Sequence, residues 1–178
     1  MHENRILIHK LKNFENINSN FLIITLMLFG SILLAISAKV QVPFWPVPMT
    51  MQTFVIFLIG MTYSVRLSFA TVAFYLFQGA IGLPVFAAGG GVAYLVGPTA
   101  GYLYGMLFAS IVISYLANLG FSKTYFKDTV SLLIGSAIIF SFGIIYLGYI
   151  IGFEKAVAAG LLPFIPSEIF KIALAVAL

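Results

Sequence analysis

The stretch "GLPVFAAGGGVAYLVGPTAGY", Gly82 to Tyr102, lies inside a longer segment, Leu67 to Ser122, that has no charged side chain. The longer segment exceeds the roughly 20 residues that one membrane-spanning helix needs. Its glycines and prolines divide it, which predicts two helices, about Leu67 to Leu83 and Pro98 to Leu119, joined by the quoted loop. Irregular backbone at membrane depth occurs only where protein buries it or where it lines a cavity. We therefore expect the loop to line a site.

The composition of the whole chain agrees with a membrane protein. Of the 178 residues, 62% are hydrophobic and 8% are charged, and the mean hydropathy is +1.11. A soluble domain carries about 25% charged residues. Further apolar runs predict helices over Phe21 to Ala38, Met49 to Val65 and Thr129 to Gly152, and a last helix that begins near Ser167.

Together these runs predict an all-α integral membrane protein with six transmembrane helices and long outward-facing loops. A polar tail, residues 1–20, precedes a single membrane domain, residues 21–178. No small-residue cleavage site follows the first apolar run, so we expect no removed signal peptide. From Ser167 the chain has room for a helix of only about 18 Å, which is short against a hydrocarbon core of about 30 Å.

The basic residues indicate the orientation of the chain. The net charge of +4 is spread along the sequence and forms no patch, so we expect it to set the topology rather than to bind nucleic acid. Positive residues favour the cytoplasmic side. The tail and the links on one side carry most of them: Arg5, Lys10, Lys12, Arg66, Lys123 and Lys127. Both termini are therefore predicted to be cytoplasmic, and the glycine loop is predicted to be external.

Several classes of chemistry lack the residues that they need. The chain has no cysteine, and its two histidines, His2 and His9, lie in the tail. No GxxxxGK[ST] or HExxH motif is present, and no acid lies in the middle of a predicted span. We therefore expect no catalytic residues, no metal site, no cofactor and no ATP site, which makes an intramembrane enzyme or a self-powered carrier improbable.

Two features could bind a ligand. Gly89, Gly90 and Gly91 expose backbone amides without side-chain cover, although a plain flexible turn explains three glycines as well. Lys171 lies one turn into the last helix, where a cation is costly and points to function. The alternatives are a lysine that extends to the outer headgroups or one that pairs with Glu168.

Other candidates are weaker. Trp45, Tyr94 and Tyr102 are outer-side aromatic residues that suit either an interfacial belt or the wall of an apolar pocket. Thr50 and Gln52, just inside the second predicted span, could add polar contacts. The small residues Gly97, Gly101, Gly105 and Ala109 recur every four positions, which favours close helix packing.

Four motifs in this order resemble one family. They are "VPFWPVPMTMQTF", "GAIGLPVFAAGGG", "GPTAGYLYG" and "PSEIFK". The chain, from about Ala35 to its end, is similar to the biotin-specific substrate-binding component of energy-coupling-factor transporters. The resemblance implies six membrane helices, biotin as the ligand near the outer face, and residence in the lipid bilayer of a bacterial cytoplasmic membrane. It also implies a transmembrane coupling protein and ATPase subunits as partners, or transport by the component alone.

The resemblance also assigns roles to residues. The glycine loop after Phe86 and the lysine at position 171 are ligand-site elements in the family, and small residues on the first helix, here Ser31 and Ala35, meet the coupling protein. The family usually has Gly-Asp where this chain has Ser167-Glu168. Lys171 then suits the biotin carboxylate, and the glycine amides with Gln52 or Thr50 suit the ureido group. A capture component for another vitamin, or a membrane assembly helper that does not transport, remain alternatives.

Overall fold

The computed structural model describes residues 19–121 and 124–178, so the predicted tail lies almost entirely outside the described part. Helices make up most of that part. In chain order they are α2 (Ser19–Lys39), α3 (Gln52–Thr62), α4 (Val65–Ala80), α5 (Ala100–Leu116), α6 (Tyr125–Ile151), α7 (Phe153–Gly160) and α8 (Ile165–Ala177). The short strands β1 (Gln41–Val42) and β2 (Met49–Thr50) pair antiparallel, and short turns of helix occupy Val92–Val96, Ala117–Phe121 and Leu162–Phe164.

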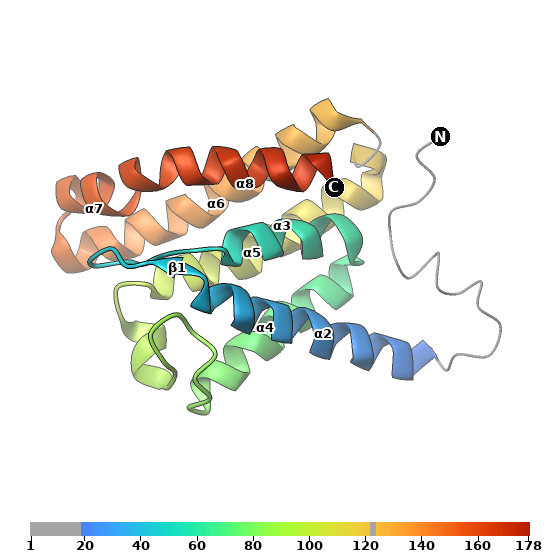
Figure 1. The fold of residues 1–178 in the computed structure, drawn as a ribbon, viewed down its shortest axis with the longest axis horizontal. Coiled ribbons are helices and arrows are strands. Elements are labelled where there is room, and N and C mark those ends of the chain that lie inside the picture. Colours follow the sequence, from blue (N-terminus) through green and yellow to red (C-terminus); the bar gives the residue numbers. More distant parts are fainter. Residues whose placement is uncertain (1–18, 122–123) are drawn as a thin grey trace.

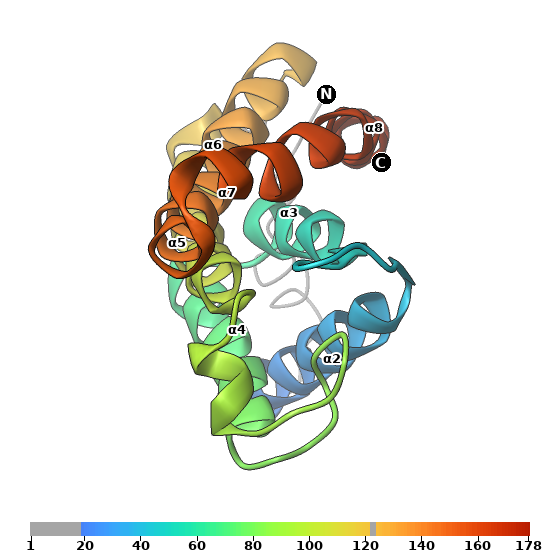
Figure 2. The same cartoon turned by 90° about the vertical axis from the view of Figure 1, so that its left-hand side faces the viewer.

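The helices form one bundle. Helix α5 packs against α3, α4 and α6, α2 packs against α3 and α4, and α8 packs against α3 and α6. Figure 2, which looks at one end of the bundle, shows α3 between α2 on one side and α8 on the other. The predicted all-α architecture of six longer helices is confirmed, and the short α7 is an addition that the sequence did not indicate.

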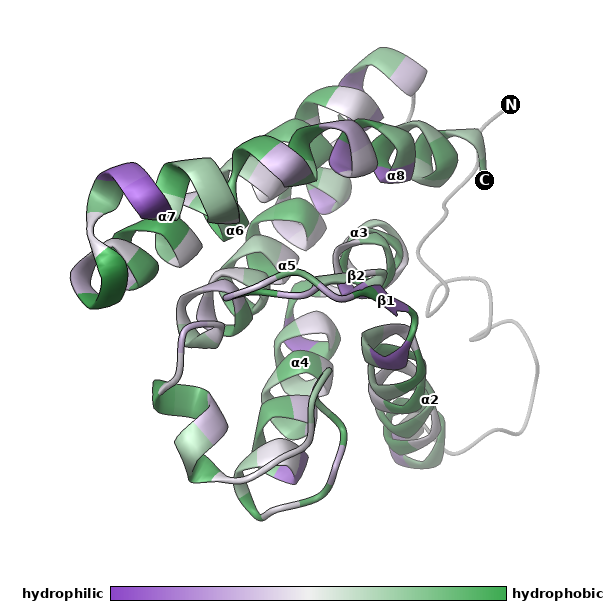
Figure 3. Ribbon diagram, turned by 60° about the vertical axis from the view of Figure 1, so that its left-hand side comes forward, coloured by the Kyte–Doolittle hydropathy of each residue, from purple (hydrophilic) through white to green (hydrophobic). Residues whose placement is uncertain are grey.

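One of the predicted spans is much shorter than expected. Helix α3 covers only Gln52–Thr62 of the predicted Met49 to Val65, because Met49 and Thr50 pair with β1 instead of joining the helix. Its 11 residues measure about 16 Å. In the described part, four helical stretches are long and apolar enough to cross a membrane: Asn20–Lys39, Ala100–Phe121, Tyr125–Ile151 and Phe153–Ala177. Figure 3 shows the corresponding predominance of hydrophobic residues along the helices.

The links that follow α2, α4 and α6 lie at the same end of the bundle (Figure 1). The chain leaves α4 by a glycine turn. Gly82 has a φ of 97°, and the N–H of Leu83 donates to the carbonyl of Gln78 at 3.1 Å. This pattern ends helices because glycine adopts a positive φ without steric cost, and it directs the following loop back over the bundle.

The small face of α5 packs against α6, as the four-residue spacing predicted. A Cβ added at Gly101 would lie 2.5 Å from the carbonyl oxygen of Phe142, and one at Gly105 would lie 2.8 Å from the Cα of Ile139. The backbones of the two helices therefore approach too closely for larger side chains. This contact fixes α6 against α5, and α6 contributes one wall of the site.

Candidate ligand-binding site

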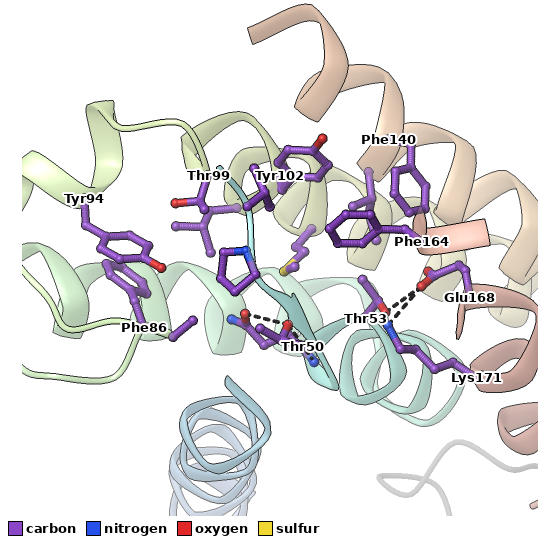
Figure 4. A pocket seen from close by; sticks show the side chains of 17 residues that line it. Thr50, Thr53, Phe86, Tyr94, Thr99, Tyr102, Phe140, Phe164, Glu168 and Lys171 are labelled. Carbon is purple, nitrogen blue, oxygen red and sulfur yellow. Dashed lines mark hydrogen bonds and ion pairs between the residues drawn. The ribbon is translucent and has the colours of Figure 1, made fainter. Parts of the chain in front are cut away.

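A narrow cavity lies under the three links, between α3, α5, α6 and α8 (Figure 4). Its free volume of about 40 Å³ has room for only a few water molecules, so a larger ligand requires the lining to move. Of the predicted site residues, seven line it: Thr50, Gln52, Phe86, Tyr94, Tyr102, Glu168 and Lys171. The structure therefore brings together predicted residues that lie more than one hundred positions apart in the sequence.

One end of the cavity holds a buried ion pair. Lys171 and Glu168, one turn apart on α8, are 2% and 4% exposed. The Nζ of Lys171 lies 3.2 Å from Oε2 of Glu168. The hydroxyl of Thr53, on α3, accepts from Lys171 at 3.0 Å and donates to the same carboxylate oxygen at 2.9 Å. From α6, the hydroxyl of Ser136 donates to Oε1 of Glu168 at 3.3 Å.

This cluster carries no net charge. A buried charge is tolerated when it is paired and its remaining hydrogen-bonding capacity is used, and Thr53 and Ser136 supply hydrogen bonds that complete the pair. The sequence offered pairing with Glu168 as an alternative to ligand binding for Lys171. The structure contains the pair and also places both side chains on the cavity wall, so the two interpretations are compatible.

A second polar group continues along the wall. The hydroxyl of Thr50 donates to Oε1 of Gln52 at 3.0 Å, and Nε2 of Gln52 donates to the hydroxyl of Tyr75 at 2.7 Å. Tyr75 in turn donates to the carbonyl of Val85 at 3.0 Å. This chain fixes which end of the Gln52 amide is the donor, and it leaves one amide hydrogen and one lone pair for a ligand.

Aromatic rings form much of the remaining lining. Phe86 stacks on Tyr94 with ring centroids 4.9 Å apart, and Tyr75 packs edge-on against Phe86 from behind. On the other side, Phe164 lies nearly parallel to Tyr102, with centroids 6.4 Å apart. Figure 4 shows Phe86 and Tyr94 at the end of the cavity away from the Lys171–Glu168 pair. An apolar ring between these walls would be shielded from water.

The other predicted ligand residues lie outside the cavity lining. Trp45 is 84% exposed. The three glycines do not line the cavity, and two of their amides are used within the protein: Gly91 donates to the Gly79 carbonyl at 2.7 Å, and Gly89 to Phe86 at 3.3 Å. Gly89 and Gly91 have positive φ values of 143° and 102°. The glycines thus shape the turn that presents Phe86, and their direct contact with a ligand stays a prediction.

The two predicted partner residues lie on α2. Ser31 is 1% exposed, and its hydroxyl donates to Oε1 of Gln78. Its role inside the bundle is therefore to join α2 to α4. Ala35 is partly exposed and lines an outer groove beside Ile32, whose side chain is 55% exposed. A contact with another protein would involve Ala35 more directly than Ser31.

Several residues of the site escaped the sequence analysis: Thr53, Phe140 and Phe164 line the cavity, and Ser136 supports Glu168 from outside the lining. Thr53 and Ser136 are ordinary helix residues by pattern, and only the approach of α3 and α6 to Glu168 gives them a role. Thr53 follows Thr50 by three positions in the sequence, but Thr50 lies in β2 and Thr53 in α3, so no helical spacing relates them. Phe140 and Phe164 could not be separated from the many other phenylalanines of the chain.

Comparison with known families gives a consistent result. The model of the BioY family matches residues 10–178. A probable biotin transporter BioY from Rickettsia prowazekii (strain Madrid E) is 36% identical over 156 residues, which cover 87% of this chain and 80% of that protein. The biotin transporter BioY from Thermotoga maritima is 36% identical over 145 residues, which cover 80% of this chain and 85% of that protein.

A solved structure has the same fold. It is a crystal structure described as the S-component for biotin from an ECF-type ABC transporter, and it superposes with a TM-score of 0.80 at 26% identity. The match covers 91% of this chain and 90% of that one. With a family model over nearly the whole sequence and relatives above 30% identity, this multi-pass membrane protein belongs to the BioY family.

Proposed function

We propose that this chain captures biotin in the cavity beneath its three links and so mediates uptake of the vitamin. The observation that carries the proposal is the neutral Lys171–Glu168 pair, completed by Thr53, at one end of an aromatic-walled cavity. The names of the BioY relatives and of the structural neighbour support the same ligand.

The chemistry of the pair favours one orientation of biotin. The ureido ring has two N–H donors and one carbonyl acceptor, so it can donate to Glu168 and accept from Lys171. A carboxylate only accepts, and beside Glu168 it would place two negative charges around one lysine in a buried site. Like charges in such a position are costly. We therefore propose that the ureido group meets the pair, and that the carboxylate points toward the links.

The rest of the lining suits the remaining parts of biotin. The apolar sulfur-containing ring would lie between the Phe86–Tyr94 stack and the Tyr102–Phe164 wall. Gln52 keeps a free amide hydrogen and a free lone pair toward the cavity, with Thr50 holding its orientation. In the opposite orientation, which the sequence alone suggested, Lys171 would meet the biotin carboxylate.

The proposal includes partners and a location. No P-loop is present in the chain, so accumulation against a gradient would require another energy source. We infer that a transmembrane coupling protein and ATPase subunits supply it, and that Ala35 and the exposed face of α2 contact the coupling protein. We place the chain in a bacterial cytoplasmic membrane with both termini cytoplasmic, the links external, and residues 21–178 as one domain that follows a short tail.

A direct binding measurement tests the proposal. Purified protein in detergent should bind biotin in a calorimetric titration, and an excess of thiamine or riboflavin should not compete. Competition by another vitamin would favour the broader capture role, and failure to bind any of them would leave an assembly function. Uptake of labelled biotin by cells that express the chain with and without a coupling protein and ATPases would then separate assisted from solitary transport.

A further inference from the structure

Three consecutive carbonyls in the loop after α4 accept hydrogen bonds from side chains of other elements. Tyr75, on α4, donates to Val85 at 3.0 Å. The ammonium of Lys39, at the end of α2, donates to the carbonyl of Phe86 at 2.6 Å and lies 3.5 Å from that of Ala87. The amide of Gln41, on β1, also donates to Ala87, at 3.3 Å. All of these carbonyls therefore have partners from the body of the bundle.

This part of the loop is a thin wall between two spaces. Phe86 and Ala87 line the ligand cavity. Lys39 lines a different groove, beside α2 and Gln78, and shares it with the adjoining loop residues Pro84 and Val85. The lysine thus contacts the wall from the side opposite to the cavity.

Peptide geometry determines what the other side presents. In a trans peptide unit the C=O and N–H groups point in opposite directions, and the cis bond recorded in the described residues is Trp45–Pro46. Because the Phe86 carbonyl points to Lys39, the Ala87 N–H of the same peptide unit points away from Lys39, toward the cavity side. Ala88, which follows, is exposed and does not line the cavity, so its N–H is not part of this wall.

The Ala87 N–H lacks a protein partner within residues 19–121 and 124–178, where no hydrogen bond is found for it. Ala87 is only 7% exposed. A buried N–H without a partner is uncommon because leaving it unsatisfied costs free energy comparable to a lost hydrogen bond. A donor of this kind at a cavity wall is available to a ligand acceptor.

Lys39 adds charge to this arrangement. Its recorded hydrogen bonds in the described residues are to carbonyl oxygens, and the salt bridge found there joins two other residues, Lys171 and Glu168. A cation that donates to a carbonyl polarises the whole peptide unit, which strengthens the N–H on the far side as a donor. The wall therefore presents one polarised N–H group, that of Ala87, with the charge of the solvent-exposed Lys39 behind it.

We propose that the Ala87 N–H group, with Lys39 behind its peptide unit, holds the carboxylate of the ligand. Lys39 acts through that peptide unit and is a positioning residue, and the Ala87 amide makes the contact. This inference rests on the proposed function, in which the ureido ring occupies the Lys171–Glu168 end and the acidic tail lies toward the links. It assigns the acid specificity of the site to the end opposite to Lys171.

Binding of biotin and of uncharged biotin amide, measured calorimetrically on the full chain, tests the inference. Lys39→Met keeps the apolar stem but removes the charge, so affinity for biotin should fall about tenfold, as expected for loss of a charge-assisted contact. Affinity for biotin amide should stay unchanged. Lys39→Arg should restore most of the affinity for biotin because it keeps the charge.

Two variants serve as controls. Lys155→Met removes an exposed cation from α7, and it should affect neither ligand. Gln41→Leu removes a neutral tether from the Ala87 carbonyl, and it should affect both ligands alike. If Lys39→Met lowered the affinity for biotin and for biotin amide equally, Lys39 would only hold the loop in place and the inference would be overturned. Unchanged affinity for both ligands would overturn it as well. If the wild-type protein bound neither biotin nor its amide, the proposed function would fail, and the inference with it.

Discussion

Replacing Lys171 by methionine should lower both the stability of the fold and the affinity for the ligand, and the two effects have separate causes. The substitution keeps the length and apolar contacts of the stem but leaves Glu168 buried, 4% exposed, with only the hydroxyls of Thr53 and Ser136 as partners. Breaking a buried ion pair by removing one member costs about 3–5 kcal/mol. We expect a clear drop in the free energy of unfolding, measured by thermal denaturation in detergent.

The double variant Lys171→Met with Glu168→Gln is the matched control. Glutamine can still accept a hydrogen bond from Thr53 and carries no charge, so no unpaired charge remains. Much of the lost stability should therefore return, although neither charged partner is available to the ligand. Binding measured on this variant reports the loss of ligand contacts without the burden of an unpaired carboxylate.

The ligand measurement decides the orientation of biotin. If Lys171 meets the ureido carbonyl, the variant loses a hydrogen bond to a charged donor, which contributes roughly 1.5–3 kcal/mol. Affinity should fall roughly ten- to a hundredfold, since about 1.4 kcal/mol is tenfold. The affinities for biotin and for biotin amide should fall by the same factor. Selective loss of biotin, with biotin amide unaffected, would refute the ureido assignment and restore the carboxylate orientation. Unchanged binding of both ligands would remove Lys171 from the site.

Three further predictions follow from the packing, the loop and the charges. Gly105→Leu should lower the thermal stability by about 1–3 kcal/mol because α5 and α6 cannot separate to admit the side chain, and full stability by thermal denaturation would contradict the close packing. Gly90→Val should weaken biotin binding in calorimetry while circular dichroism stays unchanged, since an added Cβ would lie 2.1 Å from the Leu83 carbonyl; Gly97→Ala, with its nearest contact at 3.4 Å, is the control, and equal affinities would exclude a role for the turn. Because the chain has no cysteine, single cysteines at Glu154 and Thr124 can be labelled with an impermeant reagent on intact cells, and labelling at Thr124 alone would reverse the proposed orientation.

The order of the helices could be predicted because it depends on local properties of the chain. Apolar runs of sufficient length, with Gly82 and the prolines as breaks, located the six longer helices to within a few residues, although α7 was not predicted. The exceptions have local causes that composition hides. Met49 and Thr50 are apolar enough for a span, yet they pair with β1, and pairing between strands depends on residues several positions away.

The site could be predicted only in part because its contacts are long-range. Lys171 stood out as a cation in an apolar helix, but the hydrogen bonds from Thr53 and Ser136 to Glu168 depend on how three helices pack. The glycines stay a prediction as ligand contacts, and in the structure they lie outside the cavity lining. Which amides of a loop remain free depends on which carbonyls its neighbours occupy, and Lys39 and Gln41 give no sign of this in the sequence.

In the proposed orientation, two lysines distinguish the neutral head of the ligand from its acidic tail: Lys171 lines the cavity, and Lys39 lies behind its loop wall. Lys171 is neutralised by Glu168, so the cluster at that end gains little from a second anion and more from a group that both donates and accepts. Lys39 donates hydrogen bonds to carbonyl oxygens, which carry no net charge and so do not neutralise it. A ligand bound in the opposite orientation would place its carboxylate beside Glu168 and its neutral head near Lys39. Both contacts would then be less favourable, and the affinity would be lower. Discrimination then depends on the separation of the two lysines as well as on the contacts of each, so the double variant Lys39→Met with Lys171→Met should bind biotin amide no more weakly than Lys171→Met alone. A further loss of biotin amide in the double variant, measured by the same titration, would show that the two ends do not act separately.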